Sequence, residues 1–263
     1  MSDFFGTDAQ IAVQKMLWAD HAKISRSPYL SNGGRILNVL DPDAIGWDQV
    51  RSLVEQYQVV GLTMVPLQQT IEKLRKLFGT DVDLPYWQAF LGDAEPVVRT
   101  CSALVDQYHL PDGWRFESSE SPSNDVIDAL RDLNVACGVA PTPSYYLSGD
   151  AVPSLTTCVW DENGSLAACA HATMRYHPQS RLAGAVFAGA VSVGPEFRRK
   201  GLGALTNAVL LRDSHSAFGW SRVLEQAKQD NAASCGMIRK CGLVQDADYV
   251  TIVVNLSGEY LTR

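Results

Sequence analysis

The 263-residue chain lacks the cysteine patterns of metal-binding and disulfide-rich proteins. It contains no Cys-x-x-Cys pair, and its six cysteines are too sparse for a disulfide scaffold. We therefore expect reduced, mostly buried thiols and no metal site. The cysteines lie at Cys101, Cys137, Cys158, Cys169, Cys235 and Cys241.

Long apolar runs are also missing. The longest nearly apolar stretch, Leu182 to Val193, is too short to cross a bilayer. The first residues, Met-Ser-Asp-Phe-Phe-Gly, lack the basic and apolar regions of a signal peptide. We therefore expect a soluble, cytoplasmic protein with no membrane partner.

An excess of positive charge is absent as well. The chain has 22 Lys and Arg against 29 Asp and Glu, which gives a net charge of −7. Its one dense cationic patch is residues 198–200, so it is a poor candidate for general nucleic-acid binding. We expect no nucleic-acid partner, and the acidic balance favours a cationic small substrate.

The most informative segment present is residues 191–204, VSVGPEFRRKGLGA. A strand-like apolar run, residues 183–193, breaks at Gly194-Pro195 into three cations and two glycines, and a helix is predicted over residues 204–217. The first amides of a helix are unpaired and carry about half a positive charge. Glycines let an anion approach the backbone, so the segment predicts a site for an anion such as a diphosphate.

The spacing Arg198-x-x-Gly201-x-Gly203-Ala204 resembles the acetyl-CoA loop of the GNAT superfamily of N-acyltransferases. A second segment, NAASCGMIRKCGL from Asn231 to Leu243, resembles the other signature of that family and lies the expected distance downstream. Asn231 is expected to cap a short helix that ends at Gly242. The resemblance covers roughly residues 122–255.

The resemblance implies acetyl-CoA as the co-substrate, with no metal. It also implies that the strand ending at Val193 parts from its neighbour, so that main-chain groups bind the pantetheine arm and the thioester. The residues expected to bind acetyl-CoA are Val191, Ser192, Val193, Arg198, Arg199, Lys200, Gly201, Leu202, Gly203, Ala204 and Asn231.

The order of the predicted elements suggests two lobes. Residues 1–110 alternate helical and strand-like periodicities and form a small N-terminal α/β lobe of unknown role. A linker with Pro and Gly, residues 109–113, leads into the GNAT-like domain, residues 113–263. There a strand, a helix, a three-strand meander, helix, strand, helix and strand are expected, which is the α/β (α+β) order of a GNAT-like mixed central sheet flanked by helices.

Acyl transfer to an amine requires a base, because a primary amine of pKa near 10 is almost entirely protonated at pH 7 and exposing its lone pair costs about 4 kcal/mol. Glu225 is the best catalytic candidate, since it interrupts an apolar strand on the same face as Ala227. An edge-strand glutamate that faces water is the open alternative. His171 and His177 are weaker candidates, because a lone strand histidine is more often structural.

The sequence departs from the family where many members place a tyrosine that protonates the leaving thiolate. That position is Ile238, which has no proton to donate. A covalent route through Cys235 or Cys241 is disfavoured, because neither has a histidine close in sequence. Tyr145 and Tyr146 either line the acceptor pocket or only pack.

The function favoured by these patterns is an acetyl-CoA-dependent N-acetyltransferase (acyltransferase) that acts by direct attack of a small-molecule amine. The alternative is a non-catalytic acyl-CoA sensor or partner module with the same fold. A nucleotide-binding protein of another type is disfavoured, because Gly-Leu-Gly-Ala lacks the Gly-Lys-Ser/Thr ending of a P-loop. The acceptor, the acyl-chain length and the choice between a monomer and a homodimer stay open.

Overall fold

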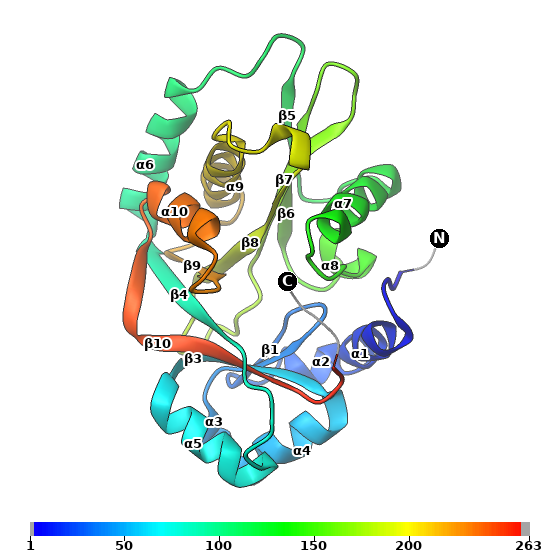
Figure 1. The fold of residues 1–263 in the computed structure, drawn as a ribbon, viewed down its shortest axis with the longest axis vertical. Helices are drawn as coiled ribbons and strands as arrows, with labels where there is room; N and C mark the ends of the chain where they lie inside the picture. Colours follow the sequence, from blue (N-terminus) through cyan, green and yellow to red (C-terminus); the bar gives the residue numbers. More distant parts are fainter. Residues whose placement is uncertain (1–2, 259–263) are drawn as a thin grey trace.

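The structure, a computed structural model, describes residues 3–258, and their strands form one ten-stranded sheet (Figure 1). The strands are β1 (Leu30–Asn32), β2 (Leu37–Val39), β3 (Val59–Pro66), β4 (Tyr86–Asp93), β5 (Arg115–Ser119), β6 (Ser154–Trp160), β7 (Leu166–Thr173), β8 (Ala185–Val193), β9 (Arg222–Ala227) and β10 (Val244–Asn255). The helices, with the 3-10 helix η1, are α1 (Asp8–Ala19), α2 (His21–Ile24), α3 (Pro42–Ile45), α4 (Trp47–Tyr57), α5 (Leu67–Phe78), α6 (Ala94–Gln107), α7 (Asn124–Ala136), α8 (Ser144–Leu147), η1 (Pro195–Phe197), α9 (Leu202–Phe218) and α10 (Ala232–Lys240). The mixed α/β fold predicted from the sequence is confirmed.

The strand order β1-β2-β3-β10-β4-β9-β8-β7-β6-β5 repeats itself about the β10–β4 pair. On one side β1 and β2 are antiparallel and β2 and β3 parallel. On the other side β7 and β8 are antiparallel and β8 and β9 parallel. The two halves exchange one strand at the middle of the sheet. The strand that follows α10, β10, pairs with β3 of the N-terminal half, and the strand that follows α5, β4, pairs with β9 of the C-terminal half.

This exchange joins the N-terminal and C-terminal segments into a continuous sheet. The predicted linker, residues 109–113, falls between α6 and β5, whereas β4 lies inside the C-terminal part of the sheet. The division into two lobes at that point stays a prediction. The sequence pattern does not reveal β1 and β4, because β1 has only three residues and β4, YWQAFLGD, follows the pattern of neither a buried nor an alternating strand.

Helices cover both faces of the C-terminal half. The helices α6, α9 and α10 lie on one face, and α7 and α8 on the other (Figure 1). The core under α9 includes Leu210, Leu211, Trp220 and Phe90, all at most 1% exposed. Burial of each such side chain stabilises the fold by roughly 1.5–3 kcal/mol, so this core positions α9 firmly on the sheet.

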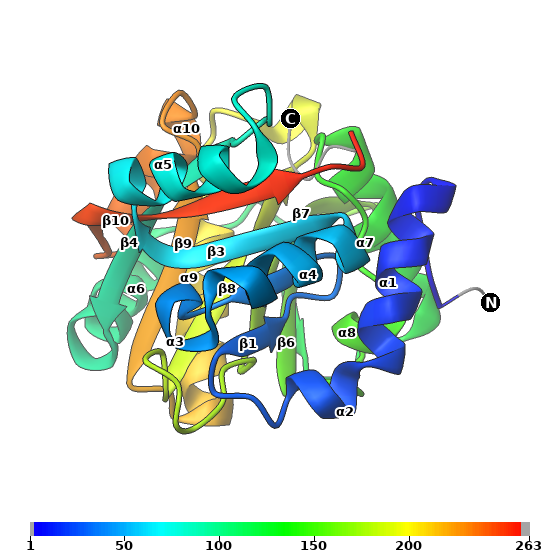
Figure 2. The same ribbon diagram turned by 90° about the horizontal axis from the view of Figure 1, so that it is seen from below.

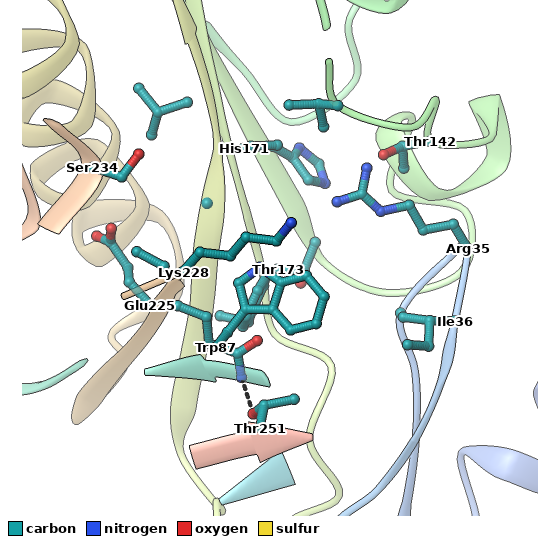
Figure 3. Close-up of a pocket in the computed structure, with 18 of the residues that line it drawn as sticks. Arg35, Ile36, Trp87, Thr142, His171, Thr173, Glu225, Lys228, Ser234 and Thr251 are labelled. Atoms are coloured by element: carbon teal, nitrogen blue, oxygen red, sulfur yellow. Dashed lines mark hydrogen bonds between the residues drawn. The ribbon is translucent and has the colours of Figure 1, made fainter. Parts of the chain in front are cut away.

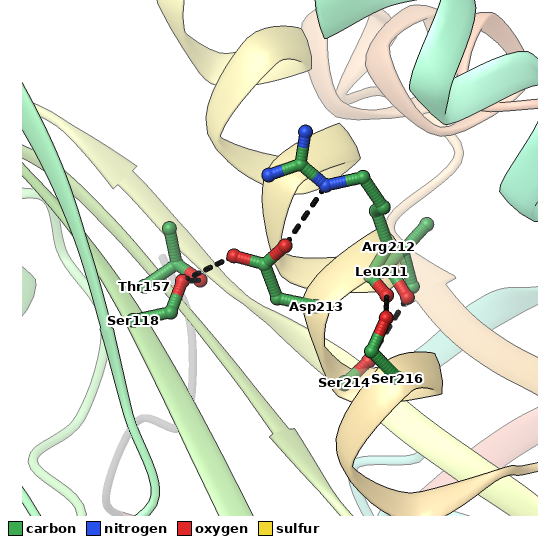
Figure 4. A network of polar contacts seen from close by, with 7 residues as sticks. All are labelled: Ser118, Thr157, Leu211, Arg212, Asp213, Ser214 and Ser216. Atoms are coloured by element: carbon green, nitrogen blue, oxygen red, sulfur yellow. Dashed lines mark hydrogen bonds and ion pairs between the residues drawn. The ribbon is translucent and has the colours of Figure 1, made fainter.

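A polar network ties the second half of α9 to the edge of the sheet (Figure 4). Ser118 on β5 donates a hydrogen bond of 2.7 Å to Oδ2 of Asp213, and Arg212 Nε donates one of 2.9 Å to Oδ1. Ser118 also lies 2.9 Å from the hydroxyl of Thr157 on β6. The helix that begins at Leu202 is therefore held at both its apolar and its polar side.

In the N-terminal half, α4 and α5 pack along β3 and β10 (Figure 2). Their apolar residues form a core with the outward-facing side chains of these strands, among them Leu62, Ile252 and Val254. The opposite face of β3 and β10 is directed toward β7 and β8, and part of it lines a cavity. Every helix in the described part of the chain is too short or too polar to cross a bilayer.

Candidate active site

Strand β8 parts from β9 halfway along its length. The two strands pair in parallel only from Ala185–Arg222 to Phe187–Leu224. On its other edge β8 carries a bulge, because the β7 register shifts between Cys169 and His171. Ala190, in the bulge, has a left-handed backbone with φ of 50°. Within the described sheet, main-chain groups beyond Phe187 on the β9 side are therefore left without a strand partner, as the resemblance implied.

The bulge also changes which side chains of β8 point to which face of the sheet. Before it, Val186 and Ala188 face the core under α9; after it, Val191 and Val193 face the same side. Ser192 points to the opposite face, where its hydroxyl donates a 2.6 Å hydrogen bond to Asn134 on α7. The sequence pattern gives no sign of the bulge. The residues on both sides of it are small, so the change in which positions face the core cannot be recognised from their hydrophobicity.

The parted strand leads into the start of α9. Gly201 is the N-cap residue with φ of 80°, and no side chain caps the helix. The first hydrogen bond into the helix runs from the Leu205 amide to the Gly201 carbonyl, at 3.1 Å. The amides before it, at residues 202–204, therefore stay available to an anion.

The three cations before α9 are exposed, and none forms an ion pair within residues 3–258. Arg198 has a structural task, because its Nε donates a 3.0 Å hydrogen bond to the Val193 carbonyl. Arg199 has a left-handed backbone with φ of 63°. Lys200 accepts a 2.9 Å hydrogen bond from Tyr108 at its carbonyl, and its ammonium lies 6.0 Å from the centroid of the Phe197 ring. The predicted contacts of these residues and of Val191–Val193 with acetyl-CoA stay predictions.

The second signature segment lies beside the first. Asn231 caps α10, as expected, by accepting a hydrogen bond of 3.0 Å from the Ser234 amide. A Cβ added at Gly203 would stand 3.5 Å from Val193 and 3.6 Å from Met237 on α10. The start of α9 therefore lies next to α10, and Asn231 and Met237 line the same cavity as the parted strand.

The connection in the N-terminal half that corresponds to this loop is acidic. Between β2 and α4 it contains Asp41 and Asp43, and Asp41 caps its own helix by accepting a 3.0 Å hydrogen bond from Ala44. The longer helix that follows, α4, begins at Gly46 without a side-chain cap, as α9 begins at Gly201, so it is the negative charge of Asp41, Asp43 and Asp48 that disfavours an anion there. Among the described residues, the repeated strand order therefore provides one anion cradle of this kind.

Glu225 is buried on β9 at the point where β8 leaves. It is 1% exposed, so the alternative of an edge-strand glutamate that faces water is wrong. Burial raises the pKa of its carboxyl to about 7. A hydrogen bond of 2.8 Å from the Asn207 side chain has the opposite effect and lowers this pKa. A carboxylate with such a pKa can accept a proton near neutral pH. Its catalytic role stays a prediction.

One cavity runs through the gap between β8 and β9 (Figure 3). Glu225, Ile238 and Asn231 line it on the side of α9 and α10. Residues from both halves of the chain line it on the α7 and α8 side, which we call the acceptor half. These are Arg35, Trp87, Thr142, Tyr146, His171, Thr173, Arg175, Phe187, Gln226 and Lys228.

His171 lies in the acceptor half with a neutral ring. Burial, together with the charges of Arg35 and Arg175, lowers its pKa to about 3. Its Nδ1 is 2.9 Å from the Thr156 hydroxyl, and its Nε2 is buried without a hydrogen-bond partner among the described residues. The ring can therefore accept or donate one hydrogen bond in the cavity, but at neutral pH it is not a cationic acid.

The remaining sequence candidates separate. Tyr146 lines the cavity, while Tyr145 packs against Trp18 with ring centroids 4.5 Å apart. His177 lies outside this cavity. Cys235 and Cys241 are buried, and hydrogen bonding of the Cys241 thiol with Cys101 together with burial raises the pKa of this thiol far above its usual range. Neither thiol is placed as a nucleophile.

Sequence reasoning missed the cationic lining of the acceptor half. Arg35 comes from the hairpin between β1 and β2, Arg175 follows β7, and Lys228 follows β9. Each cation stands just outside a strand, where charged residues are common, so no local signal marked them. In the described residues no cluster of three or more His, Cys, Asp or Glu is placed to hold a metal ion.

A comparison with models of known protein families finds a match for the central part of the chain. Residues 126–243 match the model of the acetyltransferase (GNAT) family. This range holds the parted strand, the cradle, Glu225 and the second signature segment. A comparison with curated proteins found no match.

Solved structures share the fold at low sequence identity. A Drosophila protein superposes with a TM-score of 0.61 at 14% identity, over 95% of this chain and 90% of that one. A GCN5-related N-acetyltransferase from Kribbella flavida gives 0.57 at 13%, over 95% and 97%. A tandem GNAT protein from the clavulanic acid biosynthesis pathway gives 0.55 at 13%, over 87% and 78%. The fold is that of GNAT proteins, and the repeated strand order agrees with the tandem example.

Proposed function

Because residues 126–243 form a GNAT acetyltransferase domain, we propose that the protein transfers an acetyl group from acetyl-CoA to the primary amine of a small molecule by direct attack. Family and fold support an acyl-CoA-dependent N-acyltransferase in general. The single observation that carries the finer proposal is the uncapped start of α9 beside the parted strand β8. Next to it stand three exposed cations that form no ion pair with any described residue.

The residues present suit the diphosphate, the pantetheine arm and the thioester of acetyl-CoA. The amides at 202–204 and the cations at 198–200 would hold the diphosphate, and the unpaired edge of β8 would hold the pantetheine arm. When bound, acetyl-CoA supplies a thioester whose carbon–sulfur bond breaks, with CoA leaving as the thiolate, as the carbon–nitrogen bond to the acceptor forms. Main-chain amides at the bulge of β8 are the donors in place for the oxygen that gains charge.

Glu225 is the residue that accepts the proton of the attacking amine in this proposal. Its pKa of about 7 leaves a large fraction ionised at neutral pH, while its affinity for a proton stays far above that of an exposed carboxylate. Asn207 fixes the carboxyl by its hydrogen bond. Glu225 lines the cavity itself, so a water molecule between it and the amine is the longest relay required.

The test is release of CoA from acetyl-CoA with and without a panel of amines. We expect release only when an acceptor is present, with formation of the N-acetyl product by mass spectrometry. Arg199→Glu should weaken binding of CoA more than tenfold, because it replaces an attraction to phosphate by a repulsion. Arg99→Glu is the control for the charge reversal, since Arg99 on α6 is exposed and does not line the cavity.

A second candidate function is a non-catalytic acyl-CoA sensor. The observation that favours it is Ile238, which is 1% exposed and lines the cavity where many family members place a tyrosine. Tight binding of acetyl-CoA by calorimetry, without turnover on any amine, would support the sensor. Turnover would show that the reaction needs no tyrosine at position 238, because either another group protonates the thiolate or the thiolate leaves unprotonated.

A further inference from the structure

The acceptor half is positively charged, although the chain as a whole is acidic. Its charged lining residues are Arg35, Arg175 and Lys228. Among residues 3–258, Glu225 is the one carboxylate that lines the cavity, and alternation along β9 directs its side chain to the opposite face from Gln226. Because charges farther away than about 8 Å are largely screened in physiological salt, the lining outweighs the net charge of −7.

Arg175 is the most constrained of these cations. Its guanidinium lies 3.7 Å from the centroid of the Phe187 ring, and it donates a weak hydrogen bond of 3.4 Å to the Tyr176 hydroxyl. Its Nε is buried without a hydrogen-bond partner among the described residues. No carboxylate in residues 3–258 forms an ion pair with it. A guanidinium stays charged at any physiological pH, so this half-buried cation lacks, within residues 3–258, the counter-ion that normally accompanies a cation held away from water.

Lys228 faces the same space from the other side. Its ammonium extends over the cavity, 5.6 Å from the centroid of the Trp87 ring (Figure 3). It too forms no ion pair within the described chain. Arg35 points toward His171 from the N-terminal half (Figure 3). A second positive charge on an acceptor would meet repulsion here, whereas an anion would find donors on two sides.

We propose that the acceptor half takes a primary amine that also carries an anionic group, and that Arg175 selects this acceptor by binding that group. The inference rests on the proposed acetyl transfer and names its substrate class. The planar fork of a guanidinium binds a carboxylate through two parallel hydrogen bonds, and stacking on Phe187 fixes the plane of that fork. The anion then supplies the missing counter-ion and turns the amine toward the gap between β8 and β9.

The first experiment compares matched acceptors on the wild-type enzyme. For several amino acids, kcat/KM is measured for the amino acid, its carboxamide and the decarboxylated amine. We expect the carboxylate form to be preferred at least tenfold over the other two. Aminoalkyl phosphates form a further arm, which distinguishes a phosphate from a carboxylate as the selected anion. Equal rates, or a preference for amides or diamines, would overturn the inference.

The second experiment assigns the preference to Arg175. Arg175→Gln should lower the ratio between carboxylate and carboxamide acceptors by about tenfold to a hundredfold, the usual loss for a hydrogen bond to a charged group. Arg175→Lys should keep part of it, because the charge remains but the fork is lost. Arg99→Gln is the control and should leave the ratio unchanged. The readout is a ratio, so a general loss of activity does not imitate the effect.

A binding measurement separates this inference from the proposed function. Calorimetry with CoA-saturated wild-type protein compares the amino acid with its carboxamide and needs neither turnover nor a variant. Selective binding of the carboxylate without turnover on any amine would contradict acetyl transfer and leave the inference standing. If Arg175→Gln changes the choice between acetyl-CoA and succinyl-CoA instead of the acceptor ratio, the guanidinium faces the acyl group and the inference fails.

Discussion

The side-chain amide of Asn207 on α9 donates a 2.8 Å hydrogen bond to Oε1 of Glu225 on β9, and both residues are at most 1% exposed. Burial raises the pKa of Glu225, and the bond from Asn207 is the influence that lowers it. A residue of the helix that begins at the anion cradle therefore sets the proton affinity of the proposed base.

Glu225→Gln tests the base directly. The amide keeps the shape and can still bond with Asn207, but it accepts no proton from an amine. We expect kcat for acetyl transfer to fall by about a hundredfold to ten-thousandfold, with binding of CoA unchanged. Glu196→Gln, at an exposed glutamate before the cradle, is the control. A variant at position 225 that keeps half of the wild-type kcat would exclude Glu225 as the base.

The pH profile provides a second test. With a pKa of about 7, Glu225 is protonated and inactive as a base at low pH, so kcat should fall as the pH drops below about 7. Asn207→Leu removes the donor that favours the carboxylate and should move this acid limb to higher pH. A limb that stays in place in the variant would show that another group titrates.

The anion cradle is the part of the site that the sequence predicts best. The Arg198–Ala204 segment predicted the start of a helix with free amides, and the structure has that start at Leu202 without a side-chain cap. The prediction worked because strand end, turn and helix start all depend on neighbouring residues.

The acceptor half could not be predicted in this way. Arg35, Trp87 and Arg175 meet only because β4 crosses into the C-terminal half and the β1–β2 hairpin folds over β7. The burial of Glu225 likewise depends on α9 and on β4, which pairs with β9. Such features follow from contacts between residues far apart in the chain, which neither periodicity nor spacing records.

Position 203 tests the cradle without disturbing the fold. A Cβ there meets nothing closer than 3.5 Å, so Gly203→Ala should fold normally and bind CoA within a fewfold of the wild type. Gly203→Glu places a negative charge at the start of α9 and should weaken CoA binding more than tenfold. Gly201 is less suitable, because its φ of 80° strains any other residue. Equal affinity of the alanine and glutamate variants, measured by calorimetry, would contradict the cradle.

Glu225 should also make stability depend on pH. Between its unfolded pKa of about 4.5 and its folded pKa of about 7, the folded protein holds a proton that the unfolded chain has lost. The contribution of Glu225 to the free energy of unfolding therefore falls as pH rises through this window, by about 3 kcal/mol in total. Relative to wild type, Glu225→Gln should gain stability in urea unfolding between pH 5 and pH 8. A constant difference would contradict the raised pKa.

Ala190 tests the bulge that separates β8 from β9. A non-glycine residue at φ of 50° costs roughly 1–2 kcal/mol, so Ala190→Gly should raise the free energy of unfolding by up to about 1 kcal/mol and keep activity. Ala190→Val adds a β-branched side chain that disfavours this conformation further. If the bulge holds the strands apart for the thioester, the valine variant should lose acetyl transfer and CoA binding together, while remaining folded by circular dichroism. Full activity in a folded valine variant would contradict this role of the bulge. It would show that the gap between β8 and β9 does not depend on the left-handed backbone at position 190.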